Sequence, residues 1–253
     1  MRSLAALGGA MTGRGLMIGL MRRDGADLAA TFDGVGHGAA PVRADEAGKV
    51  PQTPAEAGDL ADWLYPLFKD ALGPDCDPVL AAMQARAPMF LRVNLSRTDR
   101  AGAQMALAAE GIATRFHHSV KTALEVTENI RKVSRSSAYL SGLVEVQDAS
   151  SQAAVLALPL NAGQRVLDYC AGGGGKSLAL ADRARIEVSA HDAAPARMAD
   201  LPVRAARAGV AIEVLSGDPV ATGPFDLVIC DTPCSGSGTW RRSPDAKWRL
   251  TPE

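Results

Sequence analysis

The chain has 253 residues, of which 47% are hydrophobic and 22% charged, and its formal net charge is −1. This composition is typical of globular proteins and excludes disordered and collagen-like chains, while the near-neutral charge gives no general attraction to nucleic acid. No run of about 18 apolar residues is present, so the sequence predicts no transmembrane helix.

Residues 1–87 are predicted to form a helical, loosely organised segment. Arg14 interrupts the apolar start, and basic residues follow that stretch where a signal peptide would place them before it, so we expect an amphipathic helix and a cytoplasmic protein. Residues 34–54 are rich in Gly, Pro and Ala and indicate a linker. Apolar residues at helical spacing predict a helix over 59–72 capped by Asp59, and a second from Asp77 to residue 86.

Residues 88–147 predict a small α+β subdomain resembling an RRM domain. A helix is expected from Asp99 to Glu110, with Gly111 as its stop. The strands are expected at 89–95, 112–116, 123–128 and 143–147. From Arg92 to Arg135 eight basic residues face four acidic ones, so a polyanion site would be local to this part of the chain.

Residues 148–253 predict a doubly wound α/β domain. Asp148 or Ser150 begins a helix, after which helices at 176–184 and 195–208 separate apolar strands. The strands are expected at 165–170, 186–191, 211–215 and 225–230. Near-continuous apolar strands separated by helices indicate a parallel sheet covered on both faces, and such sheets bind ligands at the carboxyl ends of their strands.

Four consecutive glycines, Gly172–Gly175, follow the first of these strands. Glycine permits positive φ and close approach of a ligand to the backbone, and the following helix start offers free N–H groups. A dinucleotide fingerprint fails because Ser177 stands where its last glycine should be, and a phosphate-binding P-loop fails only at Cys170. A methyl-donor site is the third interpretation.

Aspartates follow three successive strands of the predicted sheet. Asp192 is placed to accept hydrogen bonds from a ribose diol, and Asp218 to meet the rim of an adenine. Asp231 ends the fourth strand and opens the segment Asp231-Thr232-Pro233-Cys234. A turn or helix cap is the alternative for any single aspartate, but three in register favour one shared pocket.

The four cysteines have neither the spacing nor the histidine partners of a metal site, and we expect no metal. Cys76 and Cys230 are predicted to be small buried hydrophobes. The segment from Trp240 to Arg249 carries four basic residues against one acidic residue. Its arginines and lysine can meet phosphates, and its tryptophans can stack on bases.

Three segments, VLDYCAGGGGKS (166–177), HDAAPAR (191–197) and DTPCSGSGTWRRSPDAKWR (231–249), resemble the Nop/Sun (Fmu-like, RsmB-type) family of S-adenosylmethionine-dependent RNA 5-methylcytosine methyltransferases. FLRVN and VEVQDASSQ extend the resemblance to about residues 88–253. The glycine turn departs from the family's commoner CAAPGGK form, because Gly172 and Gly173 stand where Ala and Pro are usual.

The resemblance implies methylation of cytosine carbon 5 in RNA, ribosomal RNA being preferred over transfer RNA. A thiolate adds to carbon 6, an acid near the ring nitrogen stabilises the developing charge, and carbon 5 then takes the methyl group before the thiol is eliminated. Asp231 would hold the base and touch the cofactor, and Cys234 would assist product release. The cofactor S-adenosylmethionine would be held by Cys170, Ala171, Gly172, Gly173, Gly174, Gly175, Lys176, Asp192, Asp218 and Asp231. RNA contacts are assigned to Arg92, Asn94, Arg241, Arg242 and Lys247.

The family's attacking thiol lies in a Thr-Cys motif after a fifth strand, and no such motif occurs in these 253 residues. We therefore expect a C-terminally truncated chain with the first four strands of the sheet, inactive alone, rather than Cys234 as the nucleophile. The strand at 225–230 would then present an open edge through which the chain could self-associate. A P-loop-like nucleotide hydrolase and a non-catalytic RNA-binding fragment are the alternatives. In the latter, Phe90, Phe116 and Tyr139 are the only obvious stacking side chains of the 88–147 subdomain, whose other interpretation is a scaffold packed on the domain that follows.

Overall fold

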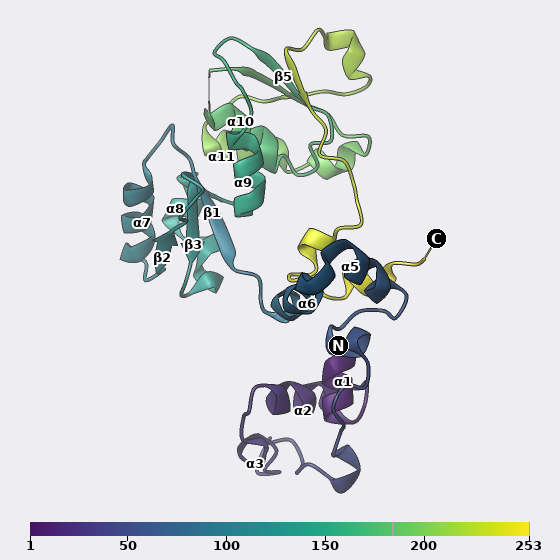
Figure 1. The fold of residues 1–253 in the computed structure, drawn as a ribbon. Helices are drawn as coiled ribbons and strands as arrows, with labels where there is room; N and C mark the ends of the chain where they lie inside the picture. Colours follow the sequence, from purple (N-terminus) through teal and green to yellow (C-terminus); the bar gives the residue numbers. More distant parts are fainter. Residues whose placement is uncertain (184, 253) are drawn as a thin grey trace. The chain divides into compact units, whose positions relative to one another are not determined.

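The computed structural model describes residues 1–183 and 185–252, and Figure 1 shows its fold. The chain forms two compact units, one made of Met1–Ala87 together with the segment from Cys234 onward, and the other of Pro88–Pro233. Our prediction placed residues 148–253 in one domain. The structure instead groups the segment after Pro233 with the first 87 residues, because Trp240 packs into their hydrophobic core.

The first unit is built of short helices. They are α1 (Arg2–Gly8), α2 (Gly13–Arg23), α3 (Leu28–Thr31), α4 (Pro54–Ala57), α5 (Leu64–Leu72) and α6 (Cys76–Gln84), with 3-10 turns η1 (Ala44–Glu46), η2 (Gly73–Asp75), η6 (Ser237–Thr239) and η7 (Ala246–Arg249). No single helix in the described part of the chain is long and apolar enough to cross a membrane, although α1 and α2, bent by 89°, meet the length and composition criteria as a pair.

Two predicted helix caps in this unit are wrong. Asp59 has φ +57 and is buried, and α5 begins five residues later, because the Asp59 carboxylate forms an ion pair with Lys247 Nζ at 3.1 Å. Asp77 lies inside the first turn of α6 and accepts a hydrogen bond from the Tyr65 hydroxyl. In both cases a contact from distant residues replaces the local capping bond.

The core of the first unit lies between α5, α6 and the C-terminal segment. Its buried members are Leu60, Leu64, Cys76, Leu80 and Trp240. The Trp240 ring stacks on Phe68 with centroids 6.0 Å apart. The predicted burial of Cys76 is confirmed.

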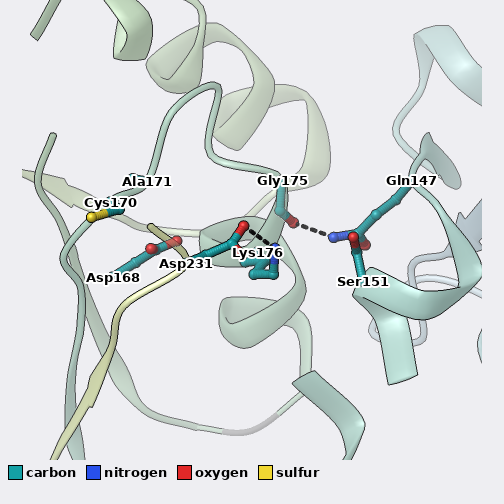
Figure 2. A pocket seen from close by; sticks show the side chains of 8 residues that line it. All are labelled: Gln147, Ser151, Asp168, Cys170, Ala171, Gly175, Lys176 and Asp231. Atoms are coloured by element: carbon teal, nitrogen blue, oxygen red, sulfur yellow. Dashed lines mark hydrogen bonds and ion pairs between the residues drawn. The ribbon is translucent and has the colours of Figure 1, made fainter. Parts of the chain in front are cut away.

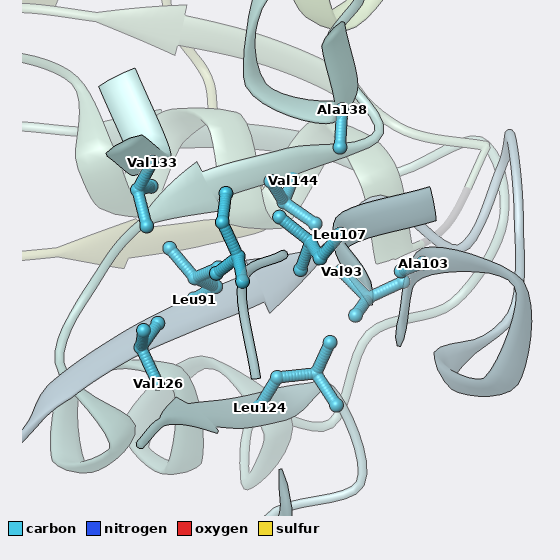
Figure 3. Close-up of a cluster of buried hydrophobic side chains, with 10 residues drawn as sticks. Leu91, Val93, Ala103, Leu107, Leu124, Val126, Val133, Ala138 and Val144 are labelled. Carbon is cyan, nitrogen blue, oxygen red and sulfur yellow. The ribbon is translucent and has the colours of Figure 1, made fainter. Parts of the chain in front are cut away.

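The second unit begins with a four-stranded antiparallel sheet in the order β2-β3-β1-β4. The strands are β1 (Met89–Val93), β2 (Thr114–Phe116), β3 (Ala123–Val126) and β4 (Val144–Val146), joined by α7 (Arg100–Ala109), the 3-10 helix η3 (Ile130–Arg135) and α8 (Ser137–Leu140). As predicted, α7 is capped by Asp99, whose side chain accepts the Gly102 N–H at 2.7 Å, and it stops before Gly111 with φ +74. Figure 3 shows the core between one face of this sheet and these helices.

The other face of this sheet packs against α9 (Ala149–Leu156). Ala123 of β3 and Ala149 of α9 belong to one buried cluster, with Phe90 and Leu156 packed against it. RNA binding by this subdomain was one of the alternatives, but a helix of the following domain covers the part of this face that holds Phe90. Phe90 therefore packs against the α/β domain, as the alternative interpretation of this subdomain as a scaffold predicts.

The second sheet is parallel, with the order β7-β6-β5-β8. Its strands are β5 (Arg165–Asp168), β6 (Glu187–Ala190), β7 (Glu213–Val214) and β8 (Leu227–Ile229), and its remaining helices are α10 (Gly175–Arg183), η4 (Pro195–Met198), α11 (Leu201–Ala208) and η5 (Pro219–Thr222). One buried cluster joins the sheet to α9 and α10. A second buried cluster joins it to α11. The predicted doubly wound α/β fold is confirmed, and the predicted helix end at Ala184 lies outside the described residues.

Strand β8 lies at the edge of this sheet and pairs only with β5 among the described strands. Cys230 follows directly after it and is exposed. The prediction that Cys230 is a buried hydrophobe is therefore wrong, because an edge strand that ends at residue 229 leaves the next side chain uncovered.

Candidate functional site

The four glycines form a tight turn between β5 and α10. Gly172 and Gly174 have φ of +53 and +78, a region that side chains other than glycine rarely adopt. A Cβ atom at Gly174 would also overlap the Leu201 side chain. The turn therefore needs glycine at both positions for its backbone conformation. At Gly174 the packing of α11 is a second reason.

Asp192, at the carboxyl end of β6, braces this turn. One carboxylate oxygen accepts the Gly172 N–H at 2.8 Å, and the other accepts the Ala194 N–H at 2.9 Å. Arg197 Nη1 lies 3.1 Å from the same carboxylate. The hydrogen bonds from the Ala194 and Gly172 amides, together with Arg197, hold the pKa of Asp192 below its ordinary value. An ionised acceptor thus lies directly against the turn.

Asp168, the last residue of β5, is only 1% exposed. Its Oδ2 accepts a hydrogen bond from Ser177 Oγ at 2.7 Å, whereas its buried Oδ1 has no partner among the described residues. Burial raises the pKa of this carboxyl, although the Ser177 hydroxyl opposes the shift. An unsatisfied buried acceptor of this kind indicates that a donor outside the chain completes the site.

A pocket of about 160 Å³ lies beside the turn and is shown in Figure 2. It is lined by Gln147, Ser151, Asp168, Cys170, Ala171, Gly175, Lys176 and Asp231. Lys176 Nζ forms a close ion pair with Asp231 at the edge of the pocket. Gln147 Nε2 donates to the Gly175 carbonyl at 3.0 Å, while its buried Oε1 has no partner in the described chain. Two of the residues that line the pocket, Asp168 and Gln147, therefore each carry a buried acceptor without a partner among the described residues.

Most of the residues predicted to bind a cofactor come together here. Cys170, Ala171, Gly175, Lys176 and Asp231 line the pocket, and Asp192 lies against the turn. Asp218 does not line this pocket. It is exposed, and its carboxylate caps η5 by accepting the Val220 N–H at 2.9 Å, which is the alternative role considered for it.

Sequence reasoning missed three residues that line the pocket, Gln147, Ser151 and Asp168. Gln147 and Ser151 belong to the VEVQDASSQ segment, which was noticed only as part of a resemblance. Asp168 lies in the segment 166–177 that carries the resemblance but was not assigned to the site. Its position at the carboxyl end of the central strand was the available signal.

Three of the five residues assigned to RNA are buried, and the structure contradicts the assignment for them. Asn94 donates to the Gly142 and Ala208 carbonyls at 3.1 and 2.8 Å, and Lys247 is held by Asp59. Arg92 is 4% exposed, and its Nε and Nη1 are buried. Arg241 is exposed, although it donates to the Ala85 and Arg86 carbonyls at 3.1 and 3.0 Å, and Arg242 is also exposed.

The two cysteines near the predicted site differ in environment. Burial, aided by the nearby Cys230, raises the pKa of the Cys170 thiol, which disfavours the thiolate that a nucleophile needs. Cys234 is exposed and begins the C-terminal segment of the first unit. Cys170 is therefore suited to lining the pocket rather than to attack.

Two family models match the chain. Residues 155–253 match the 16S rRNA methyltransferase RsmB/F model, and residues 60–133 match the ferredoxin-like domain of RsmF/B-like methyltransferases. A curated relative is the ribosomal RNA small subunit methyltransferase B of Vibrio cholerae serotype O1, which is 34% identical over 195 residues, 74% of this chain and 44% of that protein. The chain thus spans less than half the length of the curated relatives it matches.

Solved structures share the fold. The crystal structure of PH0851 matches 83% of this chain and 50% of its own with a TM-score of 0.75 and 26% identity. A methyltransferase homologue from Pyrococcus horikoshii matches 74% of this chain and 63% of its own, with a TM-score of 0.66 and 23% identity. The sequence resemblance to the Nop/Sun type is confirmed by these matches and by the family models.

Proposed function

We propose that this chain, which carries the ferredoxin-like and methyltransferase segments of the RsmB/F (Nop/Sun) family, contains the S-adenosylmethionine site of an RNA methyltransferase. The observation that carries the proposal is the glycine turn, which is braced by Asp192 and lies beside a pocket whose lining residues Asp168 and Gln147 carry buried, unsatisfied acceptors. The ribosomal RNA methyltransferases that the chain resembles make RNA the expected substrate.

The residues present fit this cofactor. The glycine turn borders the pocket and presents no side chains of its own, and the buried Asp168 Oδ1 and Gln147 Oε1 are acceptors that can take hydrogen bonds from an ammonium group. Asp192 retains lone pairs for a ribose hydroxyl. When bound, S-adenosylmethionine supplies an electrophilic methyl group. Asp218 is left out of this set because its carboxylate already caps η5.

The proposed target is carbon 5 of cytosine in ribosomal RNA. Asp231, at the edge of the pocket, would hold the base, and the ion pair with Lys176 keeps that carboxylate beside the cofactor site. Cys234 would assist release of the product. None of the four cysteines follows a threonine, so the thiol that attacks carbon 6 would come from a segment outside these 253 residues.

Calorimetric titration with S-adenosylhomocysteine and, separately, with ATP and magnesium tests the cofactor. We expect binding of S-adenosylhomocysteine alone. Binding of ATP alone would overturn the proposal in favour of a P-loop-like nucleotide site, for which Lys176 and the preceding glycines are the relevant residues.

Methyl transfer to 16S rRNA, followed by mass spectrometry of the nucleosides, tests the reaction. We expect no 5-methylcytosine from the 253-residue chain alone and its appearance once the segment carrying the Thr-Cys motif of a curated relative is fused to it. A methylated base other than 5-methylcytosine would contradict the assignment of Asp231 to cytosine but would leave the cofactor site intact.

A further inference from the structure

Two backbone carbonyls of the glycine turn are held by side chains from outside the turn. Arg204 Nη1, on α11, donates to the Gly173 carbonyl in a short hydrogen bond. Gln147 Nε2 donates to the Gly175 carbonyl at 3.0 Å. Gln147 follows β4 directly, so the α+β subdomain of residues 88–147 contributes one of these donors itself.

The other donor is oriented by the same strand. Glu145, in the middle of β4, is 6% exposed, and its Oε1 lies 3.3 Å from Arg204 Nη2. Its Oε2 accepts from Arg207 Nη2 at 2.6 Å. Arg207 in turn lies over the Tyr139 ring, with its guanidinium carbon 4.1 Å from the ring centroid. Glu145 is buried and has little freedom, so its ion pair with Arg204 is sufficient to direct that guanidinium at the turn.

We propose that Glu145, acting through Arg204, is a positioning residue that holds the glycine turn in its ligand-binding conformation. Four consecutive glycines have more conformations to lose than any other sequence of that length. When only a fraction of molecules has the competent turn, the apparent Kd rises by the inverse of that fraction. The hydrogen bond from Arg204 keeps that fraction high, and the subdomain of residues 88–147 thereby sets the affinity of the methyl-donor site.

The chain offers a matched pair of variants that separates positioning from general stability. Arg204→Met and Arg207→Met each remove one of the two ion pairs of Glu145, but only Arg204 touches the turn. We expect the Kd for S-adenosylhomocysteine to rise about tenfold in Arg204→Met and less than about twofold in Arg207→Met, since a tenfold change corresponds to a competent fraction of about one tenth. Arg204→Lys, which retains a donor, should recover part of the loss.

Hydrogen exchange of the free protein supplies a readout that does not depend on any ligand. We expect amide exchange over residues 171–177 to accelerate about tenfold in Arg204→Met and to stay at the wild-type rate in Arg207→Met. Equal exchange rates in the two variants would show that the Arg204 side chain does not hold the turn and would overturn the inference.

The inference rests on the proposed function for the identity of its ligand, and the two can fail separately. If the wild type does not bind S-adenosylhomocysteine, the proposed cofactor is wrong, and the claim about affinity falls with it. If the wild type binds and both variants bind equally well, the cofactor stands and the positioning role of Glu145 and Arg204 is wrong.

Discussion

Asp168 is the most deeply buried carboxylate of the described chain, and one of its oxygens has no hydrogen-bond partner there. A charge in this position is unfavourable, and burial raises its pKa for that reason. Under the proposed function, the buried carboxylate offsets this cost by accepting a hydrogen bond from a cationic ligand. We therefore expect the ionised Asp168 carboxylate to lower the free energy of unfolding of the ligand-free protein.

The variant Asp168→Asn tests how the charge of this one residue affects the stability of the protein. The native state binds more protons than the unfolded state between the ordinary value of 3.8 and the raised native pKa, so the wild-type free energy of unfolding falls as the pH rises through that interval. The amide removes the charge and keeps an acceptor for Ser177. We expect a higher Tm than wild type at pH 7, with a difference that shrinks as the pH is lowered towards 3.8.

The exposed Asp218 provides the control, because Asp218→Asn keeps the cap of η5 and should leave the Tm unchanged at every pH. Thermal melts followed by circular dichroism measure all three proteins. A lower Tm for Asp168→Asn at pH 7 would show that the charge of Asp168 is stabilised by the site even without a ligand.

At the scale of the elements, α7 and α5 illustrate when local signals are sufficient. The cap and stop of α7 act within three residues of its ends, and both were predicted. The predicted cap of α5 failed because Asp59 is drawn into an ion pair with Lys247, 188 positions away. A capping bond contributes about 1 kcal/mol, whereas separating a buried charge pair costs about 3–5 kcal/mol because the remaining charge is left uncompensated.

Strand β8 is the element most exposed to pairing with another chain. Among the described strands it pairs with β5 alone, and Val228 in its middle is 48% exposed. Unpaired backbone N–H and C=O groups on such a strand can pair with another chain. We expect concentration-dependent self-association of the wild type in sedimentation velocity, and a monomer for Val228→Lys, because an edge lysine opposes pairing.

Val220→Lys is the matched control, since Val220 is 82% exposed on η5 rather than on the sheet edge. It should associate like the wild type. A wild type that stays monomeric at high concentration, or two lysine variants that behave alike, would rule out association through β8.

At the scale of the whole molecule, the two compact units have separate cores. Trp240 is 3% exposed in the core of the first unit, although it lies far along the chain from α5 and α6. Trp240→Ala should cost about 3–5 kcal/mol by the usual loss for a large buried aromatic. We expect two transitions in differential scanning calorimetry, of which only one moves to lower temperature in this variant.

Trp240→Phe should restore most of the loss, because its ring can still stack on Phe68 and it removes an indole N–H that has no partner among the described residues. If both transitions shift together, or if the protein melts in a single step, the two units are not independent in stability.

The sequence by itself determined the order and kind of most elements of the second unit, and it located the glycine turn with Asp192 and Asp231. Strand periodicity, caps and glycine stops act over a few residues, so they are visible without a fold. Only the tertiary structure decided which polar side chains remain available. Asn94 donates to a carbonyl 114 positions away, and Glu145 orients an arginine of α11 that holds the turn. No local pattern encodes such pairings, because burial and charge pairing depend on which distant surfaces the folded chain brings together.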